Sequence, residues 1–220
     1  MLSIRFLAII SFILTLGFSF NSFAQDASVS DGRLGIEEII VTGTKRDISQ
    51  QDVPIAVSTI TEQQLENTFR NDVFALGQLA PNVTLTPQNG FNAIAGGMRG
   101  TGFISILVTK DPSVGIVVDD FAFNHVQAQA IEMFDMEQVE IYRGPQGTLF
   151  GKNTTGGAIA FTTKKPVLGE TTFDVEATYG QYASNDASIE KINAAVNFPI
   201  GDKLAVRISV IQDEEEGYWT

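Results

Sequence analysis

The sequence predicts an α+β domain followed by long antiparallel strands. Between residues 46 and 166, short β-prone runs alternate with two or three short helical segments and glycine-rich turns. After Pro166 the pattern changes to strict alternation of apolar and polar side chains, the period of a strand with one apolar face. Ahead of both parts, an apolar run near the N-terminus has the form of a targeting segment.

Composition excludes several classes of function. The chain has 220 residues, a net charge of −12 and no cysteine. Nucleic acid is excluded as a partner because phosphate binding needs a basic surface. Disulfides, thiolate metal sites and cysteine nucleophiles are absent, and His125 is the single histidine, so multi-histidine metal sites are also excluded. Because no catalytic constellation is visible, we expect neither enzyme activity nor a cofactor or bound metal.

Residues 1–24 are predicted to form a signal peptide. Arg5 supplies the positive charge, residues 6–20 are apolar, and Ser22 and Ala24 place small side chains at the −3 and −1 positions of a cleavage site before Gln25. The alternative is a membrane anchor. The apolar run is shorter than the about 20 residues that span a bilayer as a helix, which favours the signal peptide.

Two short helices are expected in the α+β domain. The first begins at Thr61, with Gln64 at the capping-box position, and the second is capped by Asn71 or Asp72 and ended by Pro81. Residues 120–129 are predicted as a loop and residues 132–138 as a short turn or helix. The predicted strands cover residues 53–60, 83–86, 91–98 and 113–119, and the strand–turn–strand unit that ends at residue 163.

The turn of that last unit is rich in glycine. Five glycines fall within fourteen residues, and apolar residues are interleaved among them, so we expect positive φ or close backbone approach rather than a flexible linker. A phosphate-binding loop is excluded because Gln146 replaces its first glycine and Asn153 its Ser or Thr. The glycines are Gly144, Gly147, Gly151, Gly156 and Gly157.

This run resembles the end of the plug domain of TonB-dependent outer-membrane receptors. The resemblance covers residues 46–166, where the Arg99-Gly100 turn, the strand 114–119 and residues 143–147 follow the family's order and spacing. One departure is Asp119-Asp120 in place of the usual Asp-Gly, which puts the turn geometry in question. The resemblance implies a signal peptide (1–24), a leader with a TonB box (25–45), a plug domain (46–166) and the first strands of a transmembrane β-barrel (167–220).

A β-prone segment precedes the plug. By its residues alone it is either an edge strand of the next domain or a strand that pairs with a partner's sheet. The resemblance favours the second reading, because the TonB box of the family occupies this position and is captured by TonB. The segment consists of Ile36, Glu37, Glu38, Ile39, Ile40, Val41, Thr42 and Gly43.

The alternating segments after the plug centre on residues 173–179, 192–198 and 204–210. A half-buried soluble sheet has the same alternation as a lipid-facing barrel strand. The signal peptide and the plug resemblance favour the barrel. Three strands cannot close a barrel, so we expect the sequence to be a fragment of a longer protein or a truncated gene product.

The resemblance also suggests site residues. Arg99 and Arg143 lie beside glycines at strand ends, and they are either solvated or paired with barrel glutamates that hold the plug. Ligand contact is expected in the outward-facing loops, although the same aromatic side chains would also suit packing against the barrel wall. The candidate ligand-contact residues are Asn89, Phe91, Phe121, Phe123 and His125.

The function implied by the resemblance is active uptake of a scarce ligand across the outer membrane, with the plug facing the periplasm. The expected partners are TonB, outer-membrane lipid and a small ligand, with ferric siderophore ahead of cobalamin or oligosaccharide. The alternative is a freestanding periplasmic plug-like module that binds ligand or TonB without transport.

Overall fold

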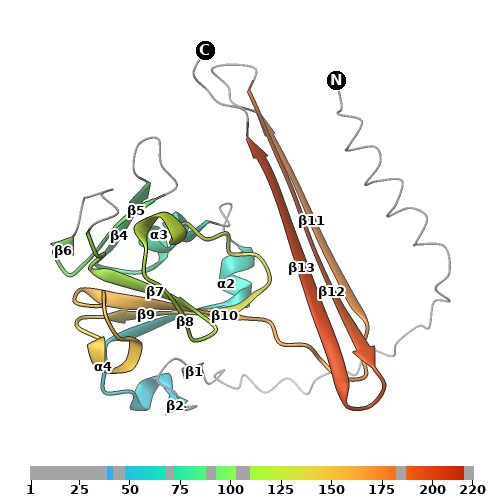
Figure 1. The fold of residues 1–220 in the computed structure, drawn as a ribbon, viewed down its shortest axis with the longest axis horizontal. Helices are drawn as coiled ribbons and strands as arrows, with labels where there is room; N and C mark the ends of the chain where they lie inside the picture. The colour runs from blue at the N-terminus through green and yellow to red at the C-terminus, as the bar shows by residue number, and fades with distance from the viewer. Residues whose placement is uncertain are drawn as a thin grey trace, which may run out of the picture. The chain divides into compact units, whose positions relative to one another are not determined.

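The computed structural model describes residues 39–41, 48–67, 72–87, 93–102, 110–181 and 187–215. These residues fall in one compact unit that spans residues 38–220. Within them lie a five-stranded sheet, a two-stranded sheet and two three-stranded sheets (Figure 1). The predicted fold class, an α+β plug followed by antiparallel strands, is confirmed.

The strands are β1 (Ile40–Val41), β2 (Ile48–Ser49), β3 (Val57–Thr61), β4 (Val83–Pro87), β5 (Ile94–Met98), β6 (Thr101–Gly102), β7 (Val114–Val118), β8 (Phe121–Phe123), β9 (Met136–Arg143), β10 (Gly157–Thr163), β11 (Thr172–Gln181), β12 (Ser188–Ile200) and β13 (Leu204–Glu215). The α-helices are α2 (Glu62–Glu66), α3 (Leu76–Leu79) and α4 (Gly147–Phe150). The 3-10 helices are η2 (Gln50–Asp52), η3 (Val73–Ala75) and η4 (Val126–Ala128).

The five-stranded sheet organises the plug, with the strand order β3-β9-β10-β7-β8. β10 pairs parallel with β7, and the other neighbours pair antiparallel. One face of the sheet packs against α2, η3 and α3, and alternating apolar positions such as Ile116, Ile141 and Ile159 are almost fully buried there. The opposite face carries a smaller cluster around Tyr142, and Val41 of β1 packs into it.

Both predicted helix starts are confirmed. The backbone N–H of Thr61 donates to Gln64 Oε1 at 3.1 Å. This is the hydrogen bond between the N-cap backbone and the N3 side chain in a capping box. The Asp72 carboxylate accepts a hydrogen bond from the backbone N–H of Ala75 at 3.2 Å, so Asp72 caps the second helical segment. That segment is a 3-10 turn followed by α3, and its C-cap is Ala80, the residue before Pro81.

The prediction of a loop at residues 120–129 was wrong. The chain turns back at Asp119 and Asp120, whose φ angles are 45° and 70°, and β8 then pairs with β7. The Asp119 carboxylate accepts hydrogen bonds from the backbone N–H of Thr163 at 3.0 Å and from its hydroxyl at 2.7 Å. Aspartate is one of the few residues other than glycine that adopts positive φ, and the bonds from Thr163 hold Asp119 in that conformation. Two aspartates therefore form the turn.

Two further strand and helix predictions differ from the structure. Residues 132–138 were predicted as a turn or helix, but Glu132 forms a β-bridge with Asp72 and β9 already begins at Met136. Pairing with β10 outweighs the local preference there, because Met136 is the register partner of Thr163. The strand predicted over residues 53–60 begins only at Val57, and the turn of the strand–turn–strand unit contains the short helix α4.

Four of the five clustered glycines have the role expected of them. Gly144 and Gly151 have φ angles of 103° and 81°. A Cβ at Gly156 would lie 2.6 Å from Thr101 Oγ1, and one at Gly157 would overlap Met98 Sδ and the Tyr142 carbonyl oxygen. At Gly147 a Cβ would meet nothing within 4 Å, so that glycine is not required for space.

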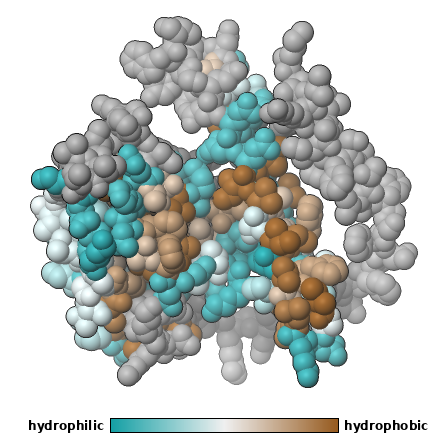
Figure 2. Space-filling model, viewed as in Figure 1, coloured by the Kyte–Doolittle hydropathy of each residue, from teal (hydrophilic) through white to brown (hydrophobic). Residues whose placement is uncertain are grey.

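The last three strands form an antiparallel sheet with β12 in the centre. They contain 10, 13 and 12 residues, and residues 201–203 connect β12 to β13. Their registers place apolar side chains of all three strands on one face, where Figure 2 shows hydrophobic residues gathered. The exposed apolar side chains of this face include Phe173, Val175, Tyr179, Phe198, Ile200, Leu204, Val206, Ile208 and Val210.

We predict that Gly157→Ala destabilises the plug, because the added Cβ would force β10 away from β9. The expected loss is about 1–3 kcal/mol of unfolding free energy. Limited proteolysis of the complete protein should show faster cleavage within the plug. The matched control is Gly147→Ala, which should leave the cleavage rate unchanged or lower it slightly, since alanine favours α4. Equal cleavage of both variants would contradict the close approach at Gly157.

Candidate functional site

Two clusters of charged side chains join the plug to the strands β12 and β13. The first is centred on Arg207, whose Nε lies 3.0 and 2.9 Å from the two carboxylate oxygens of Asp135. Arg207 Nη2 also donates to Asp135 Oδ1 at 2.5 Å and to Asp174 Oδ2 at 2.9 Å, and the Ser209 hydroxyl donates to Asp135. The Arg207 and Asp135 side chains are only 8% and 7% exposed.

The second cluster is centred on Lys191. Its Nζ lies 2.6 Å from Asp213 Oδ2 on β13 and 3.7 Å from Glu132 Oε2 on the plug. In both clusters the strands supply the cation and the plug supplies a carboxylate from the short segment 131–136. The two contacts therefore meet the plug within four residues of each other, at Glu132 and Asp135.

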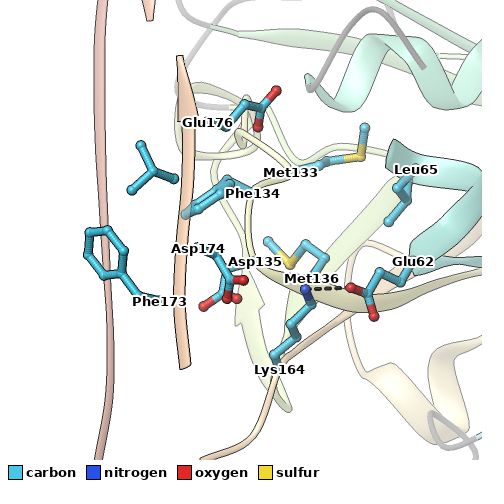
Figure 3. Close-up of a pocket in the computed structure, with 11 residues that line it drawn as sticks. Glu62, Leu65, Met133, Phe134, Asp135, Met136, Lys164, Phe173, Asp174 and Glu176 are labelled. Carbon is cyan, nitrogen blue, oxygen red and sulfur yellow. Dashed lines mark ion pairs between the residues drawn. The ribbon is translucent and has the colours of Figure 1, made fainter. Parts of the chain in front are cut away.

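A cavity of about 510 Å³ lies beside the Asp135 contact. Figure 3 shows Asp135 and Asp174 together on one side of it and the Lys164–Glu62 ion pair, 2.5 Å long, on another. Met133, Met136 and Leu65 add apolar surface. Acidic, basic and apolar groups thus line one space between the plug and β11.

The two plug carboxylates respond to this environment in opposite directions. Burial acts to raise the pKa of Asp135, but hydrogen bonds from Arg207 and Ser209 outweigh it and lower the pKa below the usual value. For Glu132, burial dominates over the attraction of Lys191, so its pKa is raised. The contact therefore stabilises the charged form of Asp135, whereas burial destabilises the charged form of Glu132.

Only part of the predicted TonB box lies within the described residues. Ile39 is half-buried, Ile40 is exposed, and Val41 is fully buried against the sheet. β1 pairs with β2, and the Gln50 N–H donates to the Ile39 carbonyl at 2.9 Å. Ile36, Glu37, Glu38, Thr42 and Gly43 lie outside the described residues. The β-character is thus seen at Ile40 and Val41, where the strand pairs within its own chain.

Val41 contacts a face that contains a buried polar network. The Tyr142 hydroxyl donates to Glu140 Oε2 at 2.9 Å, and Gln138 Nε2 donates to Glu140 Oε1 at 3.1 Å. Burial, followed by the nearby Glu140 charge, raises the pKa of Tyr142, so the phenol stays protonated as the donor. The sequence did not indicate this network, because Glu140 lies in an otherwise ordinary strand.

Arg143 directly precedes the Gly144 turn, and the Arg99 side chain lies close to that turn. Arg99 is exposed with a φ of 52°, and a Cβ at Gly144 would be 3.3 Å from Arg99 Nη1. Arg143 Nη1 donates to the Pro81 carbonyl at 3.4 Å, while its buried Nε has no hydrogen-bond partner. Within the described ranges no ion pair joins either arginine to a carboxylate, so pairing with barrel glutamates stays a prediction.

The candidate ligand-contact residues differ in their exposure. Phe121 is 69% exposed and its ring meets Phe123 edge-on at 5.5 Å. Phe123 is half-buried against the main core, and the exposed His125 immediately precedes η4. Asn89 and Phe91 lie outside the described residues. Phe121 and His125 are therefore available for contact, and Phe123 contributes to packing.

Sequence reasoning missed the four residues that form the contact, Asp135, Arg207, Glu132 and Lys191. The alternation of β12 and β13 was a usable signal, because it places Lys191 and Arg207 on the polar face. Nothing in the sequence pointed to their plug partners, which come from residues 132–135, more than 50 positions earlier.

Two absences apply to the part of the chain that the structure describes. It contains no group of three or more His, Cys, Asp or Glu side chains placed to hold a metal ion. Among the same residues, no helix is long and apolar enough to cross a membrane.

The fold and these contacts define a class of protein in which a plug-like α+β domain is followed by antiparallel strands. The sequence matches the family profile described as the TonB-dependent Receptor Plug Domain over residues 49–158. The chain therefore belongs to the TonB-dependent receptor family, and the plug predicted from the glycine-rich run is confirmed.

Known relatives agree with this assignment. The chain is 27% identical to the iron-regulated outer membrane virulence protein of Vibrio cholerae serotype O1, with 94% of this chain aligned to 32% of that protein. It is 25% identical to the vitamin B12 transporter BtuB of Vibrio vulnificus, over 71% of this chain and 24% of that one. It thus spans about a third or less of the length of these relatives.

Among solved structures, the siderophore receptor PiuA from Acinetobacter baumannii is similar in fold. The TM-score is 0.62 at 22% identity, and the match covers 83% of this chain and 24% of that one. At this identity the likeness concerns the fold alone.

We predict that Asp135→Asn lowers the free energy of unfolding of the complete protein at neutral pH. Because the pKa of Asp135 is lowered in the folded state, its stabilising effect is present above about pH 4, the ordinary aspartate value, and is lost as the pH falls through the folded-state pKa. The difference between wild type and variant, from denaturant unfolding, should therefore shrink as the pH falls below about 4. Comparing the two proteins cancels the opposite contribution of Glu132. A difference that does not shrink in acid would contradict the role of the charge.

Proposed function

We propose that the chain is the N-terminal part of a TonB-dependent outer-membrane receptor that actively takes up a scarce ligand, a ferric siderophore. The observation that carries this proposal is the presence, in one chain, of a family plug domain and three strands with an exposed apolar face. The plug faces the periplasm in this proposal, and the three strands contribute to the wall of the barrel.

The strands suit a position in the outer membrane. Transmembrane strands need about 9–11 residues, and the three here contain 10, 13 and 12. Their apolar face would contact lipid. Their other face carries Arg207, Lys191 and the buried Asn193 and Asn197, which suits contact with the plug.

A siderophore ligand is supported by the names of similar proteins. One relative is described as iron-regulated, and a structural neighbour as a siderophore receptor, whereas another relative is named as a vitamin B12 transporter. In our proposal the ligand is contacted by Asn89, Phe91, Phe121, Phe123 and His125. Arg99 and Arg143 hold the plug through carboxylates of the barrel, and the buried Arg143 Nε without a partner supports that role.

Energy coupling requires that TonB reach residues 36–43. β-Augmentation uses the backbone groups of an extended strand, and β1 has that conformation but pairs with β2. Capture of the whole segment would therefore separate β1 from β2 and withdraw Val41 from its buried position. Ligand binding would favour this release by a coupling free energy of typically about 1–3 kcal/mol.

The experiment that tests the function begins with the complete gene. Its product is expressed, the cells are fractionated, and binding of a ferric hydroxamate, a ferric catecholate and cobalamin is measured in outer-membrane fractions. The expected result is outer-membrane product that binds one of the ferric chelates. Soluble periplasmic product would replace the proposal by a freestanding plug-like module, and binding of cobalamin alone would replace the ligand.

We predict that Val210→Lys sharply reduces the amount of protein inserted in the outer membrane. A lysine on the lipid face near the middle of a strand costs about 2–4 kcal/mol, and Val210 lies on the exposed apolar face of β13. The matched control is Ile211→Lys, since Ile211 is the register partner of Asn193 on the opposite face. A heat-modifiability assay on membrane fractions measures insertion. Equal insertion of the two variants would contradict a lipid-facing role.

We also predict that Ile40→Pro abolishes energised uptake of the bound ferric chelate while its binding to de-energised cells stays within about twofold. Proline removes the backbone donor and fixes φ, so β1 can no longer serve as a strand for a partner. The control is Ile40→Val, which keeps the donor and should transport normally. Equal loss of binding and uptake would indicate that β1 only stabilises the plug.

A further inference from the structure

We propose that residues 131–136 are a fixed docking point of the plug on the strands, with Asp135 and Glu132 held by Arg207 and Lys191. The inference rests on the proposed function only in that plug and strands share one membrane-inserted protein. Its polarity is the reverse of the arginine contacts expected from the family, since here the plug supplies carboxylates and the strands supply cations.

The geometry makes the Arg207 contact specific. Asp135 receives the Nε and Nη2 donors of one guanidinium and the Ser209 hydroxyl, while Asp174 of β11 takes a second bond from Nη2. Arginine presents such donors in a rigid planar arrangement, which fixes both distance and orientation. One side chain of β13 thereby connects β11, β13 and the plug.

Burial makes the same contact sensitive to loss. Both partners are more than nine-tenths buried, so removal of the cation would leave a desolvated carboxylate without its partner. Breaking a buried ion pair costs far more free energy than the intact pair contributes. The intact pair therefore serves mainly to define a single position of the plug on the strands. Arg207 and Asp135 are therefore positioning residues for the plug.

The backbone of the docking segment is tied to the centre of the plug. The Asp135 carbonyl accepts a hydrogen bond from the Lys164 N–H at 3.0 Å, and the Ile131 carbonyl accepts one from the Val73 N–H at 3.1 Å. The segment leads directly into β9, a central strand of the five-stranded sheet. The contacts that hold residues 131–136 therefore also hold the five-stranded sheet, whereas β1 and β2 lie in a separate two-stranded sheet.

Disulfide trapping tests the contact in the complete, membrane-inserted protein. The 220-residue sequence has no cysteine, so Asp135→Cys with Ser209→Cys would form the only pair within it. We expect crosslinking under mild oxidation, detected by thiol labelling, because Lys191 still holds Glu132 of the same segment when the Asp135 carboxylate is removed. The positive control is Ala195→Cys with Ser209→Cys, because these are register partners. The negative control is Asp135→Cys with Val210→Cys, because Val210 lies on the opposite face. Crosslinking of the positive control but not of the Asp135 pair would overturn the proposal.

A second measurement separates positioning from mere proximity. The reporter pair is Glu132→Cys with Lys191→Cys, joined by a short bifunctional thiol reagent because the two long side chains meet only at their tips. This pair removes the Lys191 cluster, so the Arg207 contact alone has to position the segment. Adding Arg207→Gln should slow crosslinking by roughly 100-fold, the factor that corresponds to breaking a buried pair. Adding Arg207→Lys should slow it less, because the charge is kept but the second donor is lost.

The outcomes are distinct from those of the proposed function, since the readout needs neither ligand nor TonB. An unchanged rate with Arg207→Gln would overturn the positioning role even if the protein transports normally. Equal slowing by the two Arg207 variants would assign the effect to disturbed packing and would also overturn it. Efficient crosslinking of the Asp135 pair together with slower crosslinking of the reporter pair in Arg207→Gln supports the docking point, whatever the ligand proves to be.

Discussion

The plug depends on the close approach of β10 to its neighbours. β10 pairs with β9 on one side and with β7 on the other, and its first residue, Gly157, has no space for a side chain beside the Tyr142 carbonyl and Met98. The strands on both sides carry large, almost fully buried side chains, including Ile116, Ile141 and Tyr142. Much of the plug core is assembled on β7, β9 and β10, so the absence of a Cβ at one position permits burial at many.

The contact between plug and strands follows a different physical rule. Arg207 and Asp135 are desolvated, and an intact buried ion pair adds little net stability. The hydrophobic core supplies cohesion, and in our proposal the charged clusters fix the position of the plug on the strands. Within the charged clusters, the pKa of Asp135 is lowered and that of Glu132 is raised, because only Asp135 receives enough hydrogen bonds to outweigh its burial.

Local signals were sufficient where one residue determines one conformation. The capping roles of Thr61, Gln64 and Asp72 were predicted correctly because a cap is a contact within four residues. The alternation of β11 to β13 was also predicted, although each strand is longer than its predicted segment. Predictions failed where pairing across the sheet outweighed local preference, as at β8 and at residues 132–138.

The sequence by itself determined the class of the protein, the signals for helix starts, the glycine positions and the two faces of the last strands. These properties are local or periodic, so they can be read from the order of residues. Only the tertiary structure decided that Val41 is buried, that Glu140 lies in a polar network and that Asp135 meets Arg207. Each of these depends on segments distant in sequence, and Asp135 and Arg207 are 72 residues apart. No periodicity predicts which distant carboxylate a cation will meet, because the fold brings them together only after the sheets have formed.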